Sequence, residues 1–404
     1  MKKLITLFFF VPAVLGFVSC ANEADPVADK SFFTKFYDNS NFNVAYTPLD
    51  AVQTSDGGYV VLGLKRVIDS QGASIDPGII YLMKTDAFGA FVSDTELDAA
   101  LVTPAPAFLD IAGKFYFFCM DTNGLSTQLI EVDESGKIAQ QLNVGGSYPL
   151  AAAADGASLL LLNYDVGNKE TVMSVVSTDG HIQKSKSFTI GAGDGPEEPI
   201  MNHILRTGRL LPFQVGKTSN GLYFFNGFYN YTLSIVFTDL NAANPQGVIQ
   251  GNQEDGGMSQ IFALSGGKFA AARFNYGDNY FLPQATLTTG GITSCADLGG
   301  NSFPELSPNA PVTIMTNKIN DTDRVIYGSN TRGKQIALFG YNPADGTFVG
   351  SKYIGFSNSF ELASLTPTTD NGLLVLGTTY IAGRFPRICL FKLSAESLGE
   401  SFKQ

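Results

Sequence analysis

The sequence predicts an all-β fold, a β-propeller of seven blades with four antiparallel strands in each, closed by a strand from the N-terminal side. Three observations predict it: a phrase that occurs twice, weaker copies between the two, and apolar runs without helical periodicity. The phrase "TSDGGYVVLG" at residues 54–63 returns as "TTDNGLLVLG" at residues 368–377. A turn of Asp, Asn and Gly before a run of β-forming residues is typical of a tight turn that leads into a strand.

Both copies of the phrase continue in the same way. "IIYLMKTDAFG" follows the first and "RICLFKLSAESLG" follows the second. The aligned positions are Ile80 with Ile388, Leu82 with Leu390, and Lys84 with Lys392. Strand, turn, strand, loop, strand and turn form an antiparallel meander, which is the unit of a propeller blade.

Weaker copies of the phrase fill the interval between the two clear ones. The first turns of the copies serve as anchors at Gly58, Gly113, Gly156, Gly221, Gly267, Asp323 and Gly372. The mean spacing of these seven anchors is about 52 residues, which suits propeller blades. Since copies four to six are faint, a ring of six or eight blades is the alternative.

The apolar runs favour a ring of packed sheets. "YVVL", "FYFF", "LLLL" and "LYFF" are apolar at consecutive positions, so both faces of these strands need cover. Only "EEPIMNHILRTG" indicates a helix, and a short one, so neighbouring blades must supply the cover. Residues 31–38 indicate a strand before the first blade, and the last copy leaves little room for an outer strand. We therefore expect residues 31–38 to complete blade seven and close the ring.

The first residues indicate export from the cytoplasm. Lys2 and Lys3 precede an apolar stretch that is too short to span a membrane stably, which predicts a signal peptide over residues 1–19. Ser19-Cys20 resembles a bacterial lipobox, and this resemblance implies that Cys20 carries lipid such as palmitate and starts the mature chain. The alternative is an ordinary secreted protein. Residues 20–30 are small and acidic, so we expect a flexible tether before a single propeller domain at residues 31–404.

Two further features concern location. Glu23 and Asp25 resemble the surface-export signal of Bacteroidota lipoproteins, which implies an outer-membrane protein that faces the cell exterior. The repeat T-S-D-G-G-Y-V-V-L-G with I-Y-L-M-K-T-D-A-F-G resembles that of Bacteroidota surface propeller proteins, over about a quarter of the chain. Loss of two lysines with the signal peptide takes the formal charge from −11 to −13, which disfavours nucleic acid and anionic membranes as partners.

The candidate binding residues lie in the loops of blades four and five. They are tyrosines and asparagines, namely Tyr229, Tyr231, Tyr276, Tyr280, Asn226 and Asn279. Such residues can stack on a sugar or anchor a protein partner; alternatively, the rings plug the tops of their own blades. The chain has no Trp, the largest stacking platform, which weighs against a sugar.

Signals for catalysis are weak. His181 lies in a turn and His203 in an apolar setting, and the sequence holds no GxSxG, HExxH or phosphate-binding loop. Asp56 and Asp370 fit turn chemistry better than a calcium loop. The three cysteines after Cys20 show no metal or disulfide spacing. We therefore expect no metal or cofactor and a non-catalytic module that docks on a cell-envelope protein; the alternative is a glycan-binding or glycan-processing propeller of a polysaccharide-utilisation system.

Overall fold

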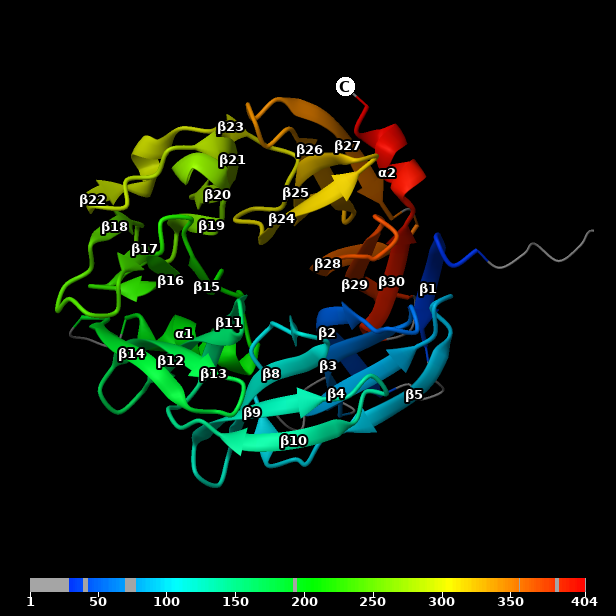
Figure 1. The fold of residues 1–404 in the computed structure, drawn as a ribbon, viewed down its shortest axis with the longest axis horizontal. Helices are drawn as coiled ribbons and strands as arrows, with labels where there is room; N and C mark the ends of the chain where they lie inside the picture. The colour runs from blue at the N-terminus through cyan, green and yellow to red at the C-terminus, as the bar shows by residue number, and fades with distance from the viewer. Residues whose placement is uncertain are drawn as a thin grey trace, which may run out of the picture.

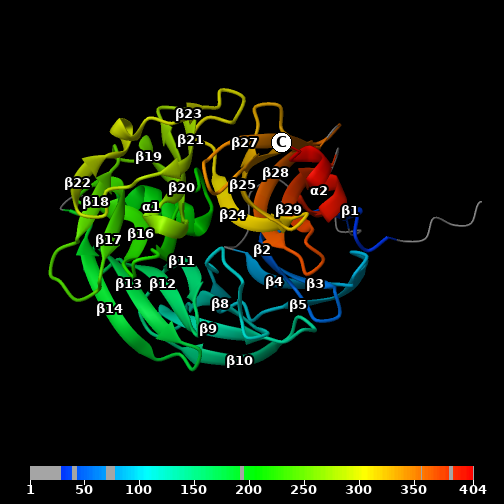
Figure 2. The same cartoon turned by 45° about the horizontal axis from the view of Figure 1, so that its top comes forward.

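The computed structural model describes residues 29–38, 43–69, 78–191, 195–355, 357–381 and 385–403. The predicted signal peptide, Cys20 and most of the predicted tether lie outside these residues. Seven sheets stand around a central axis, each with its first strand on the inside (Figures 1 and 2). The prediction of a seven-bladed propeller is confirmed, and the alternatives of six or eight blades are wrong.

Blades one, three and six follow the four-stranded meander. Blade one contains β2 (Val44–Gln53), β3 (Tyr59–Val67), β4 (Ile79–Thr85) and β5 (Phe91–Glu96). Blade three contains β11 (Pro149–Asp155), β12 (Ser158–Asp165), β13 (Glu170–Ser177) and β14 (Ile182–Thr189). Blade six contains β24 (Val312–Ile319), β25 (Thr322–Asn330), β26 (Ile336–Tyr341) and β27 (Phe348–Ile354).

Blade seven joins the two ends of the chain, as predicted (Figure 1). Its strands are β28 (Ser359–Pro367), β29 (Leu373–Tyr380), β30 (Arg387–Leu393) and the N-terminal β1 (Phe33–Tyr37). In the register of β1 with β30, Phe33 stands opposite Lys392 and Tyr37 opposite Ile388. Both terminal segments must therefore be in place before the ring is complete.

Blades two, four and five depart from the simple pattern. Blade two splits its inner strand into β6 (Leu101–Val102) and β7 (Leu109–Ile111), which both pair with β8 (Lys114–Asp121), followed by β9 (Ser126–Val132) and β10 (Ile138–Asn143). Blade four has β15 (Gln214–Lys217), β16 (Tyr223–Tyr229), β17 (Thr232–Thr238) and β18 (Gly247–Gln250). Blade five has β19 (Gly256–Ala263), β20 (Phe269–Asn275), β21 (Asp278–Ala285) and the two-residue β23 (Asn301–Ser302).

An excursion from blade five explains why the middle copies of the phrase are faint. After β21 the chain reaches back and adds β22 (Gly291–Ser294) to β18 in parallel, and then forms the 3₁₀ helix η2 (Cys295–Leu298). A second 3₁₀ helix, η1 (Ser265–Gly267), forms the first turn of blade five. Blade four thus has the four antiparallel strands that the sequence predicts and a fifth strand that runs parallel to its neighbour.

One predicted anchor is displaced by two residues. The first turn of blade six is formed by Asn320 and Asp321, which have φ of 48° and 60°. Asp323 lies in β25 instead. The segment "NDTD" offers several turn-forming residues in a row, so composition alone does not locate the turn.

Two helices flank the ring. The predicted short helix is present as α1 (Glu197–Leu205), in the connection from blade three to blade four. The chain ends in α2 (Ala395–Ser401), which lies against blade six, where Lys352 Nζ donates to Ser397 Oγ at 3.0 Å. No helix of the described part of the chain is long and apolar enough to cross a membrane.

The core lies between adjacent blades, because strands that are apolar on both faces need cover on both sides. Leu62 of β3 and Phe117 of β8 belong to one buried cluster between blades one and two. The second strands are the most completely buried, for example β12, in which six consecutive residues are buried. Cys119, Cys295 and Cys389 are free and buried, so their interpretation as small apolar side chains is confirmed.

Candidate functional site

Two tyrosines occupy the tips of hairpins on one face of the ring. The turns between the second and third strands consist of Asn230-Tyr231 in blade four and Tyr276-Gly277 in blade five. All four residues have positive φ, with 46° and 75° in the first turn and 47° and 96° in the second. Positive φ at both central residues is typical of a two-residue type I′ hairpin. A left-handed conformation is uncommon for a bulky residue such as tyrosine.

Both tips are open to solvent and flank the same connection between blades. Tyr231 is 46 % exposed and Tyr276 is 68 % exposed. Tyr276 N donates to Asp255 O at 2.9 Å, and its hydroxyl accepts a hydrogen bond from Asn252 Nδ2. On the other side, Leu233 N donates to Gln253 O at 2.8 Å. The segment 252–255 therefore links the two tyrosine tips into one rim.

A small cavity of about 140 Å³ opens beside Tyr231. Its walls include Pro196, Pro199, Phe228, Tyr231, Gln253 and Glu254. Gly191 lets the Tyr231 ring approach, because a Cβ at this position would lie 2.7 Å from ring atoms. Arg209 braces the opposite wall, since Nη1 donates to Glu254 O at 2.7 Å while the guanidinium lies 4.7 Å from the centre of the Phe274 ring.

The other two candidate tyrosines are placed differently. Tyr229 ends β16 and is only partly exposed, packed against the core between blades three and four. Tyr280 lies within β21, where the Arg273 guanidinium stacks 3.9 Å from the ring centre. Arg273 Nε in turn donates to Gly299 O at 2.6 Å. Tyr229 and Tyr280 thus pack within their blades, while Tyr231 and Tyr276 are exposed at the hairpin tips.

The two candidate asparagines lie inside the fold. Asn226 is fully buried and its Nδ2 donates to Pro212 O at 2.8 Å and to Met258 O at 2.6 Å. Asn279 is also buried; its Nδ2 donates to Ser307 O at 2.8 Å and its Oδ1 accepts from Ala310 N at 2.9 Å. These amides fasten one blade to the next and do not reach the surface where a partner would make contact. Both residues lie within strands, Asn226 in β16 and Asn279 in β21, and not in the loops where the sequence predicts them.

The repeated phrase builds the same polar cluster on the opposite face in blades one and seven. In blade one, Lys84 Nζ donates to Thr54 Oγ1 at 2.5 Å and to Asp56 Oδ1 at 2.9 Å. In blade seven, Lys392 Nζ donates to Thr368 Oγ1 at 2.7 Å and to Asp370 Oδ1 at 2.6 Å. In each copy the threonine hydroxyl also donates to the aspartate and the glycine two residues later donates its amide to it.

This cluster explains the repeated glycine and the role of the aspartates. A Cβ at Gly58 would lie 2.2 Å from Thr85 O, and one at Gly372 would lie 2.1 Å from Lys392 Nζ. Partial burial raises the pKa of the Asp56 carboxyl, but hydrogen bonds from Thr54, Lys84 and the Gly58 amide outweigh it and lower this pKa to about 2. The aspartates are thus charged members of a turn, and the interpretation as turn chemistry is confirmed.

Neither histidine joins a catalytic cluster. His203 is buried in α1, its Nδ1 accepts from Leu211 N at 3.0 Å, and its ring packs edge-on against Phe213. Burial lowers the pKa of His203 to about 3, so the ring is neutral and serves packing, as predicted. His181 lies in the exposed turn between β13 and β14, beside Asp179. The described residues contain no group of three or more His, Cys, Asp or Glu side chains that could hold a metal ion.

The central channel carries a second set of polar contacts, made between neighbouring blades. Asp50 Oδ2 accepts from Phe108 N at 2.8 Å, Gln214 Oε1 accepts from Ile261 N at 2.9 Å, and Gln260 Oε1 accepts from Ile314 N. Burial raises the pKa of the Asp50 carboxyl to about 6, although the Phe108 and Ala51 amides donate to it. A cavity of about 430 Å³ is lined by inner strands β11, β15, β19 and β24.

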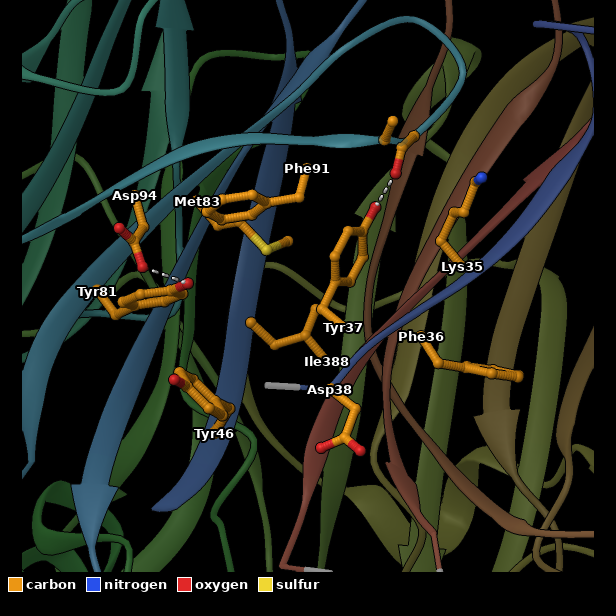
Figure 3. Close-up of a pocket in the computed structure, with 12 residues that line it drawn as sticks. Lys35, Phe36, Tyr37, Asp38, Tyr46, Tyr81, Met83, Phe91, Asp94 and Ile388 are labelled. Atoms are coloured by element: carbon orange, nitrogen blue, oxygen red, sulfur yellow. Dashed lines mark hydrogen bonds between the residues drawn. The ribbon is translucent and has the colours of Figure 1, made fainter. Parts of the chain in front are cut away.

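A further cavity, of about 440 Å³, lies at the closure between blades seven and one (Figure 3). We call it the seam cavity; its walls are Tyr37, Tyr46, Tyr81, Met83, Phe91 and Ile388, with Lys35, Asp38 and Asp94 at its edges. Sequence reasoning missed it. A signal was present, because Tyr81 and Met83 align with Cys389 and Phe391 in the last copy of the phrase, so the two clear repeats differ on this face.

Comparisons with known proteins found similar solved structures at low sequence identity. No family model matches the chain, and no curated protein matches it. The β-propeller domain of the trilobed protease from Pyrococcus furiosus is similar, with 8 % identity, a TM-score of 0.46, and coverage of 87 % of this chain and 94 % of that one. NanB sialidase from Streptococcus pneumoniae aligns with 10 % identity, a TM-score of 0.47, and coverage of 90 % and 71 %. A protein of unknown function from Bacteroides caccae has 10 % identity, a TM-score of 0.32, and coverage of 73 % and 78 %.

Proposed function

We propose that this protein is a non-catalytic binding module, tethered to the outer membrane through lipid on Cys20, that docks on another cell-envelope protein. The observation that carries the proposal is the pair of exposed tyrosines, Tyr231 and Tyr276, on strained hairpin tips that flank one connection. Left-handed tyrosines at a loop tip gain nothing for the core, and strained backbone concentrates at functional sites.

A protein partner suits this rim better than a sugar. Tyrosine supplies a large contact area with few rotatable bonds, and it is enriched where interface energy concentrates. The cavity beside Tyr231 is small and has two proline walls, Pro196 and Pro199, and this shape suits one side chain better than a chain of sugar rings. The alternative of a glycan-binding or glycan-processing propeller rests on the same tyrosines, which can also stack on sugars.

The double substitution Tyr231→Ala with Tyr276→Ala tests the site. Partner binding should fall by well over tenfold, since two anchor residues of roughly 2 kcal/mol each are removed. The melting temperature should stay nearly unchanged, because both rings are exposed. Tyr353→Ala is a matched control, since Tyr353 is 44 % exposed but lies on the outer strand β27 of blade six.

The partner is identified by a photo-crosslinking residue placed at the exposed position 253, between the two tyrosine tips, in intact cells, followed by mass spectrometry. The expected result is one stoichiometric envelope protein whose capture persists in Tyr353→Ala and is lost in the double variant. Equal capture by the double variant would contradict the proposal. Saturable binding to a defined glycan, lost in the same double variant, would establish the alternative instead.

The anchor is tested separately. Labelled palmitate should enter the wild-type chain and be absent from Cys20→Ala, which removes the acceptor thiol. Stable anchoring needs more than one acyl chain, so the wild-type protein should remain in the membrane fraction after a salt wash while the variant is released. Label in the variant, or none in the wild type, would show that the chain is not lipidated at Cys20.

A further inference from the structure

The seam cavity combines aromatic walls with a carboxylate, and nothing in the proposed docking site uses it. Tyr46 and Tyr81 form one wall, with ring centres 5.1 Å apart and planes inclined by 58°. Tyr37 and Ile388 lie across the cavity from this wall, with Met83 between the two walls and the Phe91 ring beside Met83 (Figure 3). Tyr46, Tyr81, Met83 and Ile388 are almost completely buried, while Phe91 is 54 % exposed.

The hydroxyl groups of two wall tyrosines are held by residues at the edge of the cavity. Tyr81 Oη donates to Asp94 Oδ2 at 3.1 Å, and Tyr37 Oη donates to Gly89 O at 2.7 Å. A phenol that donates to a carboxylate has a more electron-rich ring, which strengthens its attraction for a cation. Rings rather than hydroxyls therefore form the walls of the space.

The turn next to Phe91 is held by hydrogen bonds to one carboxylate. Asp86 Oδ1 accepts from Phe88 N at 2.9 Å and from Ala90 N at 2.8 Å. Gly89 has φ of 70°, and a Cβ there would lie 2.5 Å from the Phe33 ring, so the repeated glycine lets β1 approach the turn. The position of Phe91 at the cavity thus follows from ring closure itself.

The charges at the edges favour a positive ligand. Asp94 is exposed at one edge, and its negative charge lies next to the Tyr81 ring. Asp38 is already paired with the buried Arg387, with Oδ1 and Nε 2.8 Å apart. Among the described residues that line the space, Lys35 is the one positive side chain, and Figure 3 shows it on the far side of Tyr37 from Tyr46 and Tyr81. The Arg387 guanidinium lies 5.7 Å from the centre of the Tyr46 ring, and its charge is paired with Asp38. The formal net charge of −11 adds a field of the same sign as Asp94.

We propose that the seam cavity binds a quaternary ammonium group, such as that of free choline or of a choline lipid headgroup. Aromatic faces around a cavity attract such cations, whose charge is spread over methyl groups and is weakly hydrated. The volume of about 440 Å³ accommodates a small organic ion. The ligand makes contact with Tyr46, Tyr81 and Phe91 through their ring faces and with Asp94 through its charge.

The experiment is a chemical-shift titration of the full mature chain with choline chloride and with 3,3-dimethylbutan-1-ol, its uncharged isostere. Choline should bind with a Kd of about 1 mM or below, and the alcohol at least about tenfold more weakly. Phe91→Ala and Asp94→Asn should each weaken choline binding by about threefold or more, since both residues are exposed and the fold should tolerate the change. Phe88→Ala is the control, because Phe88 is 39 % exposed in the same turn but does not line the cavity.

Two results would overturn the proposal. If the uncharged alcohol binds as tightly as choline, or choline does not saturate the shifts up to about 50 mM, the cavity is not a cation site. Co-sedimentation with phosphatidylcholine vesicles separates the two sources of the ligand. Vesicle binding that free choline displaces assigns a lipid headgroup, whereas choline binding without vesicle binding assigns a free solute.

Discussion

Blade one and blade seven share their turns but differ on the faces that meet their neighbours. Both hold a lysine, a threonine and an aspartate in the same cluster at the first turn. The residues between the repeated ones are different: Tyr81 and Met83 of blade one stand where blade seven has Cys389 and Phe391. The residues that the two copies share therefore stabilise the first turn of both blades. The residues that differ shape the contact of each blade with its neighbour.

The two faces have different consequences. Cys389 and Phe391 belong to the buried cluster that blade seven shares with Leu338 of blade six. Phe391 also packs against Phe360 of its own blade, with ring centres 5.4 Å apart. Tyr81 and Met83 face blade seven across the closure, where packing is incomplete and the seam cavity remains. The contact between blades seven and one, where the N-terminal strand closes the ring, thus leaves a cavity. The contact between blades six and seven is filled by side chains.

The largest expected effect is on closure. Deletion of residues 31–38 removes β1, its pairing with β30 and the buried ring of Phe33. We expect a loss of about 4 kcal/mol or more in the free energy of unfolding, measured by denaturant titration. Deletion of residues 21–28, which precede the strand, is the control and should leave the midpoint unchanged. A cooperative transition at the wild-type midpoint after loss of residues 31–38 would show that β1 does not close the ring.

A smaller effect tests whether the two clusters are equivalent. Lys84→Met and Lys392→Met each keep the apolar stem and remove the charged donor. Each should lower the free energy of unfolding by about 1 to 3 kcal/mol, the range for hydrogen bonds to charged groups. Chemical denaturation of the two single variants measures both values. A loss in only one copy would mean that the repeated phrase has different roles in the two blades.

The smallest expected effect is on the pH dependence of stability. It arises from a residue that differs between the two blades. Asp50 of blade one is paired with Leu62, and Ser364 of blade seven holds the equivalent place opposite Leu376. Because the folded chain raises the pKa of Asp50 to about 6, ionisation costs more in the fold than in the unfolded chain. Stability from the protonated acid is present below the ordinary pKa of about 3.9 and is lost as the pH rises through about 6.

Asp50→Asn should therefore flatten this part of the pH profile. From pH 5 to pH 8, the free energy of unfolding of the variant should rise relative to that of the wild type by of order 1 kcal/mol. This figure allows for the partial exposure of the carboxyl. Thermal melts of the variant and the wild type at both pH values measure it. A difference that does not change with pH would mean that Asp50 titrates normally.

The sequence predicts the blades and their closure better than it predicts which residues a partner would contact. The number of blades, the closure and α1 follow from the repeats and the apolar runs in the sequence. The pattern recurs because every blade has to cover both apolar faces of its strands. The excursion that adds β22 to blade four has no counterpart in other blades, so no repeat reveals it. Among the candidate residues, the hairpin tips Tyr231 and Tyr276 are exposed. Asn226 and Asn279 are buried because they lie within β16 and β21, which neighbouring segments cover.

Closure in a defined register is the central structural claim, and one cross-link tests it most directly. Phe36 stands opposite Cys389 in the pairing of β1 with β30, so Phe36→Cys places a thiol opposite a native one. Under mild oxidation, peptide mapping by mass spectrometry should find a disulfide between positions 36 and 389, which ties the two ends of the chain together. Thr34→Cys, two residues away on the same face, should remain reduced. A cross-link from position 34, or none from either position, would contradict this register of closure.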